Sequence, residues 1–128
     1  MKTKSIESRT ASALEFLRSI VARPRLEAQQ VSMLLTLQDL PSEGVTMQAL
    51  GKACNASQSF ISRNCQAFGA KSLGKRLVGL RIADDDPRYR TVFLTEEGRA
   101  SMQLFVGIIE GTSEVPRGTR HAVDRRTK

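Results

Sequence analysis

Apolar residues recur at helical spacing in the first forty residues, which predicts two helices. The first helix covers residues 8–22, and its apolar stripe consists of Ala13, Leu14, Leu17, Ile20 and Val21. Pro24 marks its end, because the residue before a proline avoids helical backbone. A second pattern covers residues 26–39 through Val31, Leu34 and Leu35 and stops at Leu40-Pro41. Its high apolar density predicts a central core helix.

The next stretch, residues 45–68, has the local signals of two short helices joined by a tight turn. Thr46 and Ser57 are the residue types that cap helix N-termini. Asn55 lies between the two segments, and asparagine is one of the few residues other than glycine that tolerates a left-handed backbone. A capped helix, a short turn and a second capped helix predict a helix-turn-helix.

The second of these helices, residues 57–68, is predicted to have one buried and one polar face. Ile61, Cys65 and Phe68 recur at helical spacing and should be buried. The opposite face carries side chains of the kind that read base edges in a DNA major groove: Ser57, Gln58, Ser59, Ser62, Arg63 and Gln66. We expect Gln58, Ser59, Ser62 and Arg63 to be exposed. An ordinary solvated helix face is more often rich in Glu and Lys.

The remaining pattern predicts a two-stranded hairpin and a final helix. Residues 77–82 and 91–94 suit two strands, and residues 84–88 suit the turn between them. Thr95 is placed to cap a helix that ends near Gly111. Its apolar face consists of Met102, Phe105, Ile108 and Ile109. The predicted fold class is mainly α with a small β-hairpin wing, a winged helix-turn-helix.

The length of 128 residues fits one domain. We assign residues 1–110 to the winged helix-turn-helix and residues 111–128, which have no periodicity, to a basic flexible tail. The chain has no apolar run of the roughly 20 residues that a membrane span needs. Its first ten residues lack the apolar core of a signal peptide. We therefore expect a cytoplasmic protein that does not bind a membrane.

The formal net charge of +7 suggests a polyanionic partner. The positive charge is concentrated in residues 1–25, 57–90 and 111–128. Five cations near the predicted wing are candidates for contacts with DNA phosphates: Lys71, Lys75, Arg76, Arg88 and Arg90. For each of them, an ordinary solvated charge is the alternative. Tyr89 is interpreted either as a phosphate contact or as a cover for the hairpin.

No arrangement of residues predicts catalysis, a metal or a cofactor. Asp84, Asp85 and Asp86 suit a turn and have no nucleophile or base beside them in sequence. The single histidine, His121, lies in the tail without metal-ligand spacing around it. Cys54 and Cys65 occupy apolar helix positions, where free cysteine acts as a small buried hydrophobe; sensing of oxidants is the alternative. We therefore expect a protein that is not an enzyme.

Three stretches resemble the MarR-type winged-helix transcription regulators. They are TMQALGKACNASQSFISR at residues 46–63, DDDPRYR at residues 84–90 and LTEEGR at residues 94–99. The resemblance covers roughly residues 31–105. It implies a homodimer, formed through the N-terminal and C-terminal helices, that binds double-stranded DNA. It also implies one recognition helix, residues 57–68, in each major groove and a basic wing on the backbone or in the minor groove.

The chain departs from the pattern of this family in its linker and its wing. The linker GAKSLGKR, residues 69–76, is longer than is usual, and the returning wing strand is short. In addition, only one C-terminal helix is evident, where the family has a long C-terminal helical pair. Which of Arg88 and Arg90 lies at the wing tip stays open.

The leading functional hypothesis is a sequence-specific, double-stranded-DNA-binding transcriptional regulator, most simply a repressor. Two alternatives stay open, because a fold does not determine function. One is a protein-interaction module that acts as an adaptor or inhibitor of a polymerase or regulator. The other is DNA binding for replication or partition. The pattern does not reveal an operator or a small-molecule effector.

Overall fold

The computed structural model describes residues 4–82 and 90–116. The elements in this part of the chain follow the predicted order and confirm the winged-helix fold class. The helices are α1 (Ile6–Ile20), α2 (Ala28–Asp39), α3 (Met47–Cys54), α4 (Gln58–Ala67) and α5 (Glu96–Glu110). The strands are β1 (Val45–Thr46), β2 (Val78–Ile82) and β3 (Arg90–Leu94).

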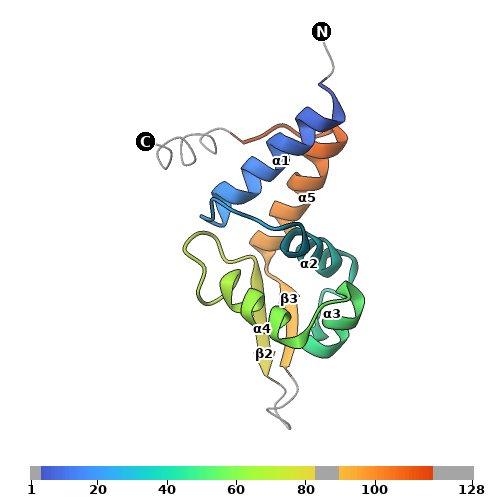
Figure 1. Cartoon of the computed structure of the whole chain (residues 1–128), viewed down its shortest axis with the longest axis vertical. Coiled ribbons are helices and arrows are strands. Elements are labelled where there is room, and N and C mark those ends of the chain that lie inside the picture. The colour runs from blue at the N-terminus through green and yellow to red at the C-terminus, as the bar shows by residue number, and fades with distance from the viewer. Residues whose placement is uncertain (1–3, 83–89, 117–128) are drawn as a thin grey trace.

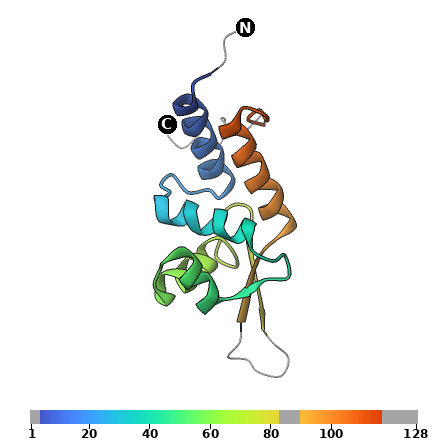
Figure 2. The same ribbon diagram turned by 90° about the vertical axis from the view of Figure 1, so that its right-hand side faces the viewer.

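The elements form two tiers, which Figures 1 and 2 show from two sides. Helices α1 and α5 lie side by side in the upper tier, near the N-terminus of the chain. Helices α3 and α4 and the sheet form the lower tier, from which the β2–β3 hairpin points away from α1 and α5. Helix α2 lies between the tiers and contacts α3, β3 and α5. This arrangement places the helix-turn-helix and the hairpin together at one end of the molecule.

Local hydrogen bonds account for where the helices of the lower tier begin. The side chain of Thr46 accepts from the Ala49 N–H, and that of Ser57 accepts from the Phe60 N–H, each at 3.1 Å. Asn55, between them, has a left-handed backbone with φ of 54°. The predicted caps and the predicted asparagine turn are therefore confirmed.

The two N-terminal helices differ slightly from their predicted bounds. Helix α1 ends at Ile20 rather than at residue 22, because Ala22 takes a left-handed φ of 58° and the Arg23 N–H donates back to the Arg18 carbonyl at 2.9 Å. Such a closing bond is typical of helix C-termini. Helix α2 begins at Ala28 rather than at residue 26. Glu27 is its N-cap residue, and the Glu27 N–H donates to the Gln30 side chain at 2.9 Å.

The sheet in the described residues has three strands: the predicted hairpin, which is confirmed, and a short third strand that was not predicted. Strands β2 and β3 form the predicted antiparallel hairpin, with Val78 opposite Leu94. Strand β1 pairs with the other edge of β3, where Val45 lies opposite Val92. A strand of two residues is too short to show the alternating pattern of a β-strand. Its pairing depends on β3, which lies more than forty residues further along the chain.

One hydrophobic core joins the two tiers. Ile61, Cys65 and Phe68 are at most 1% exposed, which confirms the predicted buried face of residues 57–68. They pack in the same cluster as Leu17 of α1 and residues of α2 and α5. The recognition-helix candidate is therefore attached to the body of the protein along its whole apolar stripe. None of the helices in the described residues combines the length and apolar character needed to cross a bilayer.

Beyond α5, residues 111–116 continue as an irregular segment. Gly111 ends the helix as expected, with a left-handed φ of 82°. The N–H groups of Thr112 and Ser113 then donate to the Gly107 carbonyl at 2.8 and 3.1 Å. Val115 packs against the core. Residues 117–128 of the predicted tail lie outside the described residues.

Candidate nucleic-acid interface

Most of the predicted polar face of α4 is open to solvent. Gln58, Ser59 and Arg63 are exposed, as expected. The Arg63 Nε donates to the Ser59 carbonyl at 3.3 Å, which directs its side chain along the outside of the helix. Three side chains with planar or small hydrogen-bonding groups are thus available on one surface.

The other three residues predicted for this face differ in how far they are exposed to solvent. Ser57 is exposed, but its side chain is used as the N-cap of α4 and lies 3.2 Å from the Ser59 Oγ. Ser62 and Gln66 are half-buried, so the expectation that Ser62 is exposed is wrong. Ser62 follows the buried Ile61 directly, which places it at the border between the two faces of the helix. The fully exposed part of the face is therefore narrower than predicted.

A buried amide pair fixes α4 against α2. The Gln30 Nε2 donates to the Asn64 Oδ1 at 2.8 Å, and the Asn64 Nδ2 donates to the Phe60 carbonyl at 2.9 Å. Both side chains are more than 90% buried. This pair could not be predicted from the sequence, because no local pattern links two residues 34 positions apart. The pair holds the orientation of α4, since a buried amide without its partner is costly.

We expect the Gln30–Asn64 bond to appear as a coupling energy in a double-mutant cycle. Gln30→Met and Asn64→Leu each remove one partner with little change in shape, and the cycle should give a coupling of about 1 kcal/mol in the free energy of unfolding. Urea denaturation of the four proteins provides the measurement. The matched control replaces Gln30→Met by Gln29→Ala at the neighbouring exposed position. If the effects of Gln30→Met and Asn64→Leu on the free energy of unfolding were as additive as those in the control cycle, the Gln30–Asn64 bond would not stabilise the fold.

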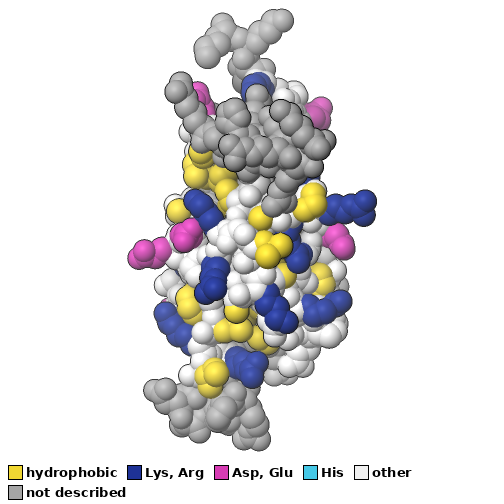
Figure 3. Space-filling model, turned by 90° about the vertical axis from the view of Figure 1, so that its left-hand side faces the viewer, with side chains coloured by type: hydrophobic (Ala, Val, Ile, Leu, Met, Phe, Trp, Pro, Cys, Tyr) yellow, Lys and Arg dark blue, Asp and Glu magenta, His cyan; other side chains and the backbone are white. Residues whose placement is uncertain are grey.

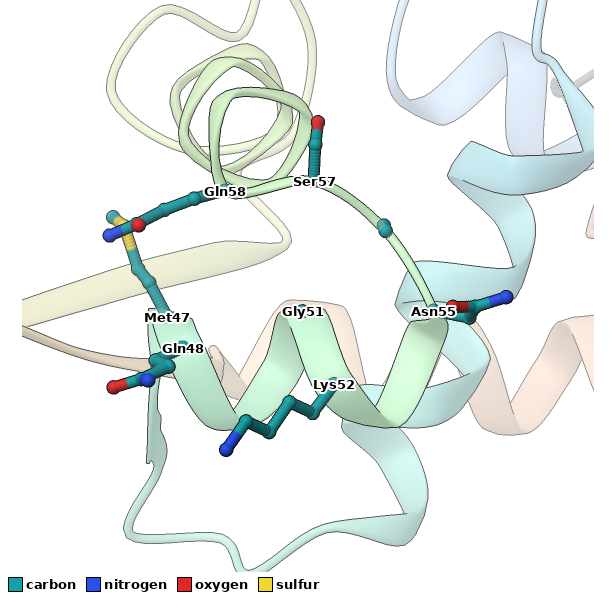
Figure 4. Close-up of a pocket in the computed structure, with 8 residues that line it drawn as sticks. Met47, Gln48, Gly51, Lys52, Asn55, Ser57 and Gln58 are labelled. Atoms are coloured by element: carbon teal, nitrogen blue, oxygen red, sulfur yellow. The ribbon is translucent and has the colours of Figure 1, made fainter.

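A hollow of about 430 Å³ lies between α3 and the start of α4 (Figure 4). Its lining comes from both helices and the turn between them: Met47, Gln48, Gly51, Lys52, Asn55, Ala56, Ser57 and Gln58. In Figure 4, Met47 and Gln58 approach each other across its mouth, and Lys52 extends along the outside of α3. Gln48 and Lys52 were not among the residues predicted to contact DNA, although both precede the turn of the predicted helix-turn-helix. Their polar groups extend the exposed surface of α4 onto α3.

The described part of the wing carries two exposed arginines. Arg81 lies on β2, with its guanidinium 4.3 Å from the centre of the Phe93 ring, and its Nη1 donates to the Glu43 carbonyl at 3.4 Å. The ring of Phe93 lies over Gly79, where a Cβ would approach it to 2.3 Å. Arg90 begins β3 and is exposed. Arg88, Tyr89 and residues 84–86 lie outside the described residues.

The linker between α4 and β2 presents the other predicted cations. Lys71, Lys75 and Arg76 are all exposed. The linker that carries them follows α4 in the chain. Leu73, between them, is 88% exposed.

The two cysteines lie on the apolar side of the helix-turn-helix. Cys65 is buried, and its burial, together with the nearby Cys54, raises the pKa of its thiol to about 12. Cys54 is half-buried; burial raises the pKa of its thiol, while a hydrogen bond with Thr36 acts in the opposite direction. A raised pKa disfavours the thiolate, which is the form that reacts with oxidants. Within the described residues, no three His, Cys, Asp or Glu side chains gather as metal ligands; His121 lies outside them.

We therefore expect both thiols of the native protein to react slowly with a thiol reagent. With a pKa of about 12, roughly one Cys65 in ten thousand is a thiolate at pH 8. Because burial disfavours the charged thiolate and so raises the pKa, raising the pH from 7 to about 9 should leave Cys65 almost unmodified while the protein stays folded. Mass spectrometry after timed alkylation, with the denatured protein as control, gives the rates. Rapid modification of Cys65 in the folded protein would instead favour oxidant sensing.

No protein-family model and no curated protein sequence matches the chain. Solved structures match it across nearly its whole length. A complex of MepR from S. aureus with DNA has a TM-score of 0.64 and 18% identity, covering 95% of this chain and 86% of that chain. A transcriptional regulator of the MarR family from Silicibacter pomeroyi has a TM-score of 0.56 and 20% identity, covering 95% of this chain and 80% of that chain.

BpsR from Bordetella bronchiseptica, in a structure that addresses the regulation of its DNA binding by 6-hydroxynicotinic acid, has a TM-score of 0.55 and 20% identity. That match covers 94% of this chain and 85% of that chain. At identities of this size, the likeness concerns the arrangement of helices and strands. The chain therefore has the winged-helix fold that these regulators share.

Proposed function

We propose that the chain is a MarR-type winged-helix regulator that binds double-stranded DNA, with α4 in the major groove. The exposed polar face of α4 carries this proposal. Gln58, Ser59 and Arg63 are exposed to solvent on a helix whose opposite side is buried in the core. Gln and Arg side chains form paired hydrogen bonds with adenine and guanine respectively. These three residues are assigned to base contacts, and Ser57, Ser62 and Gln66 to the margin of the same surface.

The charge around α4 supports DNA as the partner. The stretch from residue 44 to residue 83 contains no Asp or Glu, although it carries six Lys and Arg. A surface without acids does not repel phosphates, and its cations attract them at long range. We assign the predicted wing cations, Arg88 and Arg90, to phosphate contacts. We assign Arg81, which is exposed on β2, to phosphate contacts as well.

A homodimer formed through α1 and α5 would present two copies of α4 to one duplex. Ile6, at the start of α1, is 57% exposed. Further apolar side chains of these two helices are only partly buried: Leu14, Ile20, Leu104, Val106 and Ile109. They lie in the tier opposite the wing (Figure 2), so pairing there would leave α4 free. MepR, solved with DNA, provides the structural precedent for a duplex as the partner.

In this proposal the protein acts in the cytoplasm as a repressor, occupying a promoter and excluding other proteins from it. No cofactor and no catalytic step are required. DNA binding for replication or partition would use the same surface, and the identity of the bound site would separate these roles.

The experiment that tests DNA binding is fluorescence anisotropy with a labelled random duplex at about 50 and 200 mM salt. A protein that contacts several phosphates should bind more weakly at the higher salt, since binding releases counterions. Selection of bound duplexes from a random pool would then define the preferred site and the spacing of its halves. If no duplex is bound at either salt concentration, the DNA hypothesis fails. The fold would then serve as a protein-interaction module.

A further inference from the structure

The linker of residues 69–76 is anchored to the end of α1. The Lys75 N–H donates to the Ile20 carbonyl at 2.8 Å. Gly74 lies so close to the α1 end that a Cβ there would be 2.3 Å from the Ile20 carbonyl oxygen. Only glycine permits this approach of two backbones. The linker, although long, is therefore fixed against a helix that precedes it by fifty residues.

Further hydrogen bonds close the linker at both ends and at its tip. The N–H groups of Leu77 and Val78 both donate to the Phe68 carbonyl, at 2.8 and 3.1 Å. The Thr95 hydroxyl donates to the Arg76 carbonyl at 2.7 Å. The Ser72 hydroxyl donates to the Lys75 carbonyl at 3.0 Å and accepts from the Gly74 N–H at 3.2 Å. The backbone positions of the linker cations are thus set by the fold.

A further cation, Arg23, lies in the turn between α1 and α2, next to the part of α1 that the linker contacts. The Arg23 guanidinium lies 5.8 Å from the centre of the Phe68 ring, at the C-terminal end of α4. Residue 23 directly follows the segment that packs against Gly74. Arg23 therefore joins Lys71, Lys75 and Arg76 in one group, which we call the basic linker surface.

The charges of the basic linker surface are not neutralised by ion pairs within the described part of the chain. None of its four cations forms an ion pair with any of residues 4–82 or 90–116. Figure 3 views the side on which Figure 1 draws α4, the linker and the end of α1. Lys and Arg side chains are spread across this face, whereas Asp and Glu lie towards its margins. Like charges held within a Debye length repel each other, and a polyanion relieves that repulsion.

We propose that the basic linker surface binds phosphates of the DNA backbone next to the bases that α4 reads, as a contact separate from the wing. The proposal rests on the proposed function. DNA suits this surface because regularly spaced phosphates can meet several fixed cations at once, without base recognition. Lys71, Lys75 and Arg76 lie in the segment that leaves the C-terminal end of α4, and the proposal places them beside a duplex held by α4. Arg23 extends the contact towards α1.

The test compares the unmodified protein with a variant in which Arg23, Lys71, Lys75 and Arg76 are all replaced by Gln. Anisotropy is measured with a random and a selected duplex over a range of salt concentrations. Each lost phosphate contact should reduce the slope of log K against log salt by about 0.9, so the loss of four contacts should reduce the slope by about 3.6. The affinities for the two duplexes should fall by the same factor, which leaves the preference between them unchanged.

Lys4→Gln is the matched control, because it removes an exposed cation at the other end of α1. It should change the slope little. If the unmodified protein binds DNA and the four-fold variant keeps its slope, the basic linker surface does not contact DNA and this inference alone fails. If the unmodified protein binds no duplex, the proposed function fails, and this inference fails with it. Loss of preference between the two duplexes would assign the surface to base reading instead of phosphate binding.

Discussion

Phe68→Ala is expected to lower the free energy of unfolding by about 3–5 kcal/mol, the range for removing a buried phenylalanine ring. Phe68 is 0% exposed and is the C-cap residue of α4. Its ring packs in the common core, and the Arg23 guanidinium lies 5.8 Å from the centre of the ring. Removal of the ring leaves a cavity at the point where α4, the linker and the α1–α2 turn meet. Chemical denaturation followed by circular dichroism measures the loss.

Phe60→Ala is the matched control for Phe68→Ala, since Phe60 belongs to the same helix but is only half-buried. Its replacement should cost clearly less, because less apolar area leaves contact with the core. Equal losses for the two variants would contradict the assignment of Phe68 as the residue that joins α4 to the body of the protein. The comparison does not depend on any ligand, so it tests the fold separately from the proposed function.

Arg63→Ala is expected to weaken binding to the selected DNA site by about 1–3 kcal/mol, or roughly 5–150-fold, and to relax one position of that site. Arg63 is exposed near the middle of the polar face, and its only described hydrogen bond is the 3.3 Å contact with the Ser59 carbonyl on its own helix. A guanidinium placed there can turn to a base edge without breaking a tertiary contact. Selection from a random pool with the unmodified and the variant protein measures the preference.

Lys71→Gln provides the comparison for Arg63→Ala, because it also removes an exposed cation but lies on the linker. It should weaken binding to all duplexes by a similar factor and leave the preferred site unchanged. If Arg63→Ala instead behaves like Lys71→Gln, Arg63 is a phosphate contact and the bases are read elsewhere on α4. An Arg63→Ala protein with unchanged affinity and unchanged preference would remove α4 as the reading helix.

The buried contacts of α4 have a functional consequence under this proposal. A base-reading side chain is useful only if its helix keeps one orientation, since displacement by about an ångström disrupts paired hydrogen bonds. The Gln30–Asn64 bond and the Phe68 ring hold two successive turns of α4 from the inside. The polar face can therefore carry small, adaptable side chains such as Gln58 and Ser59 without loss of position.

The amino-acid sequence by itself determined the elements whose signals are local. Thr46, Ser57 and Thr95 cap their helices as predicted, because a hydroxyl and an N–H three residues later need no other part of the chain. Asn55 was predictable for the same reason, since its left-handed backbone follows from its own side chain. The burial of Ile61, Cys65 and Phe68 follows from the helical period. These signals were sufficient for the winged-helix fold class and for the exposure of Gln58, Ser59 and Arg63.

Only the tertiary structure decided which distant residues meet. Strand β1 forms because β3 offers it an edge, and Gln30 bonds to Asn64 across 34 positions. Arg23 lies near the Phe68 ring, and Gly74 lies against the backbone at the end of α1. Such contacts depend on how the helices pack as a whole, and the short-range patterns of capping and periodicity do not record them. For the same reason, the linker cations appeared in the sequence as separate charges and in the structure as one surface with Arg23.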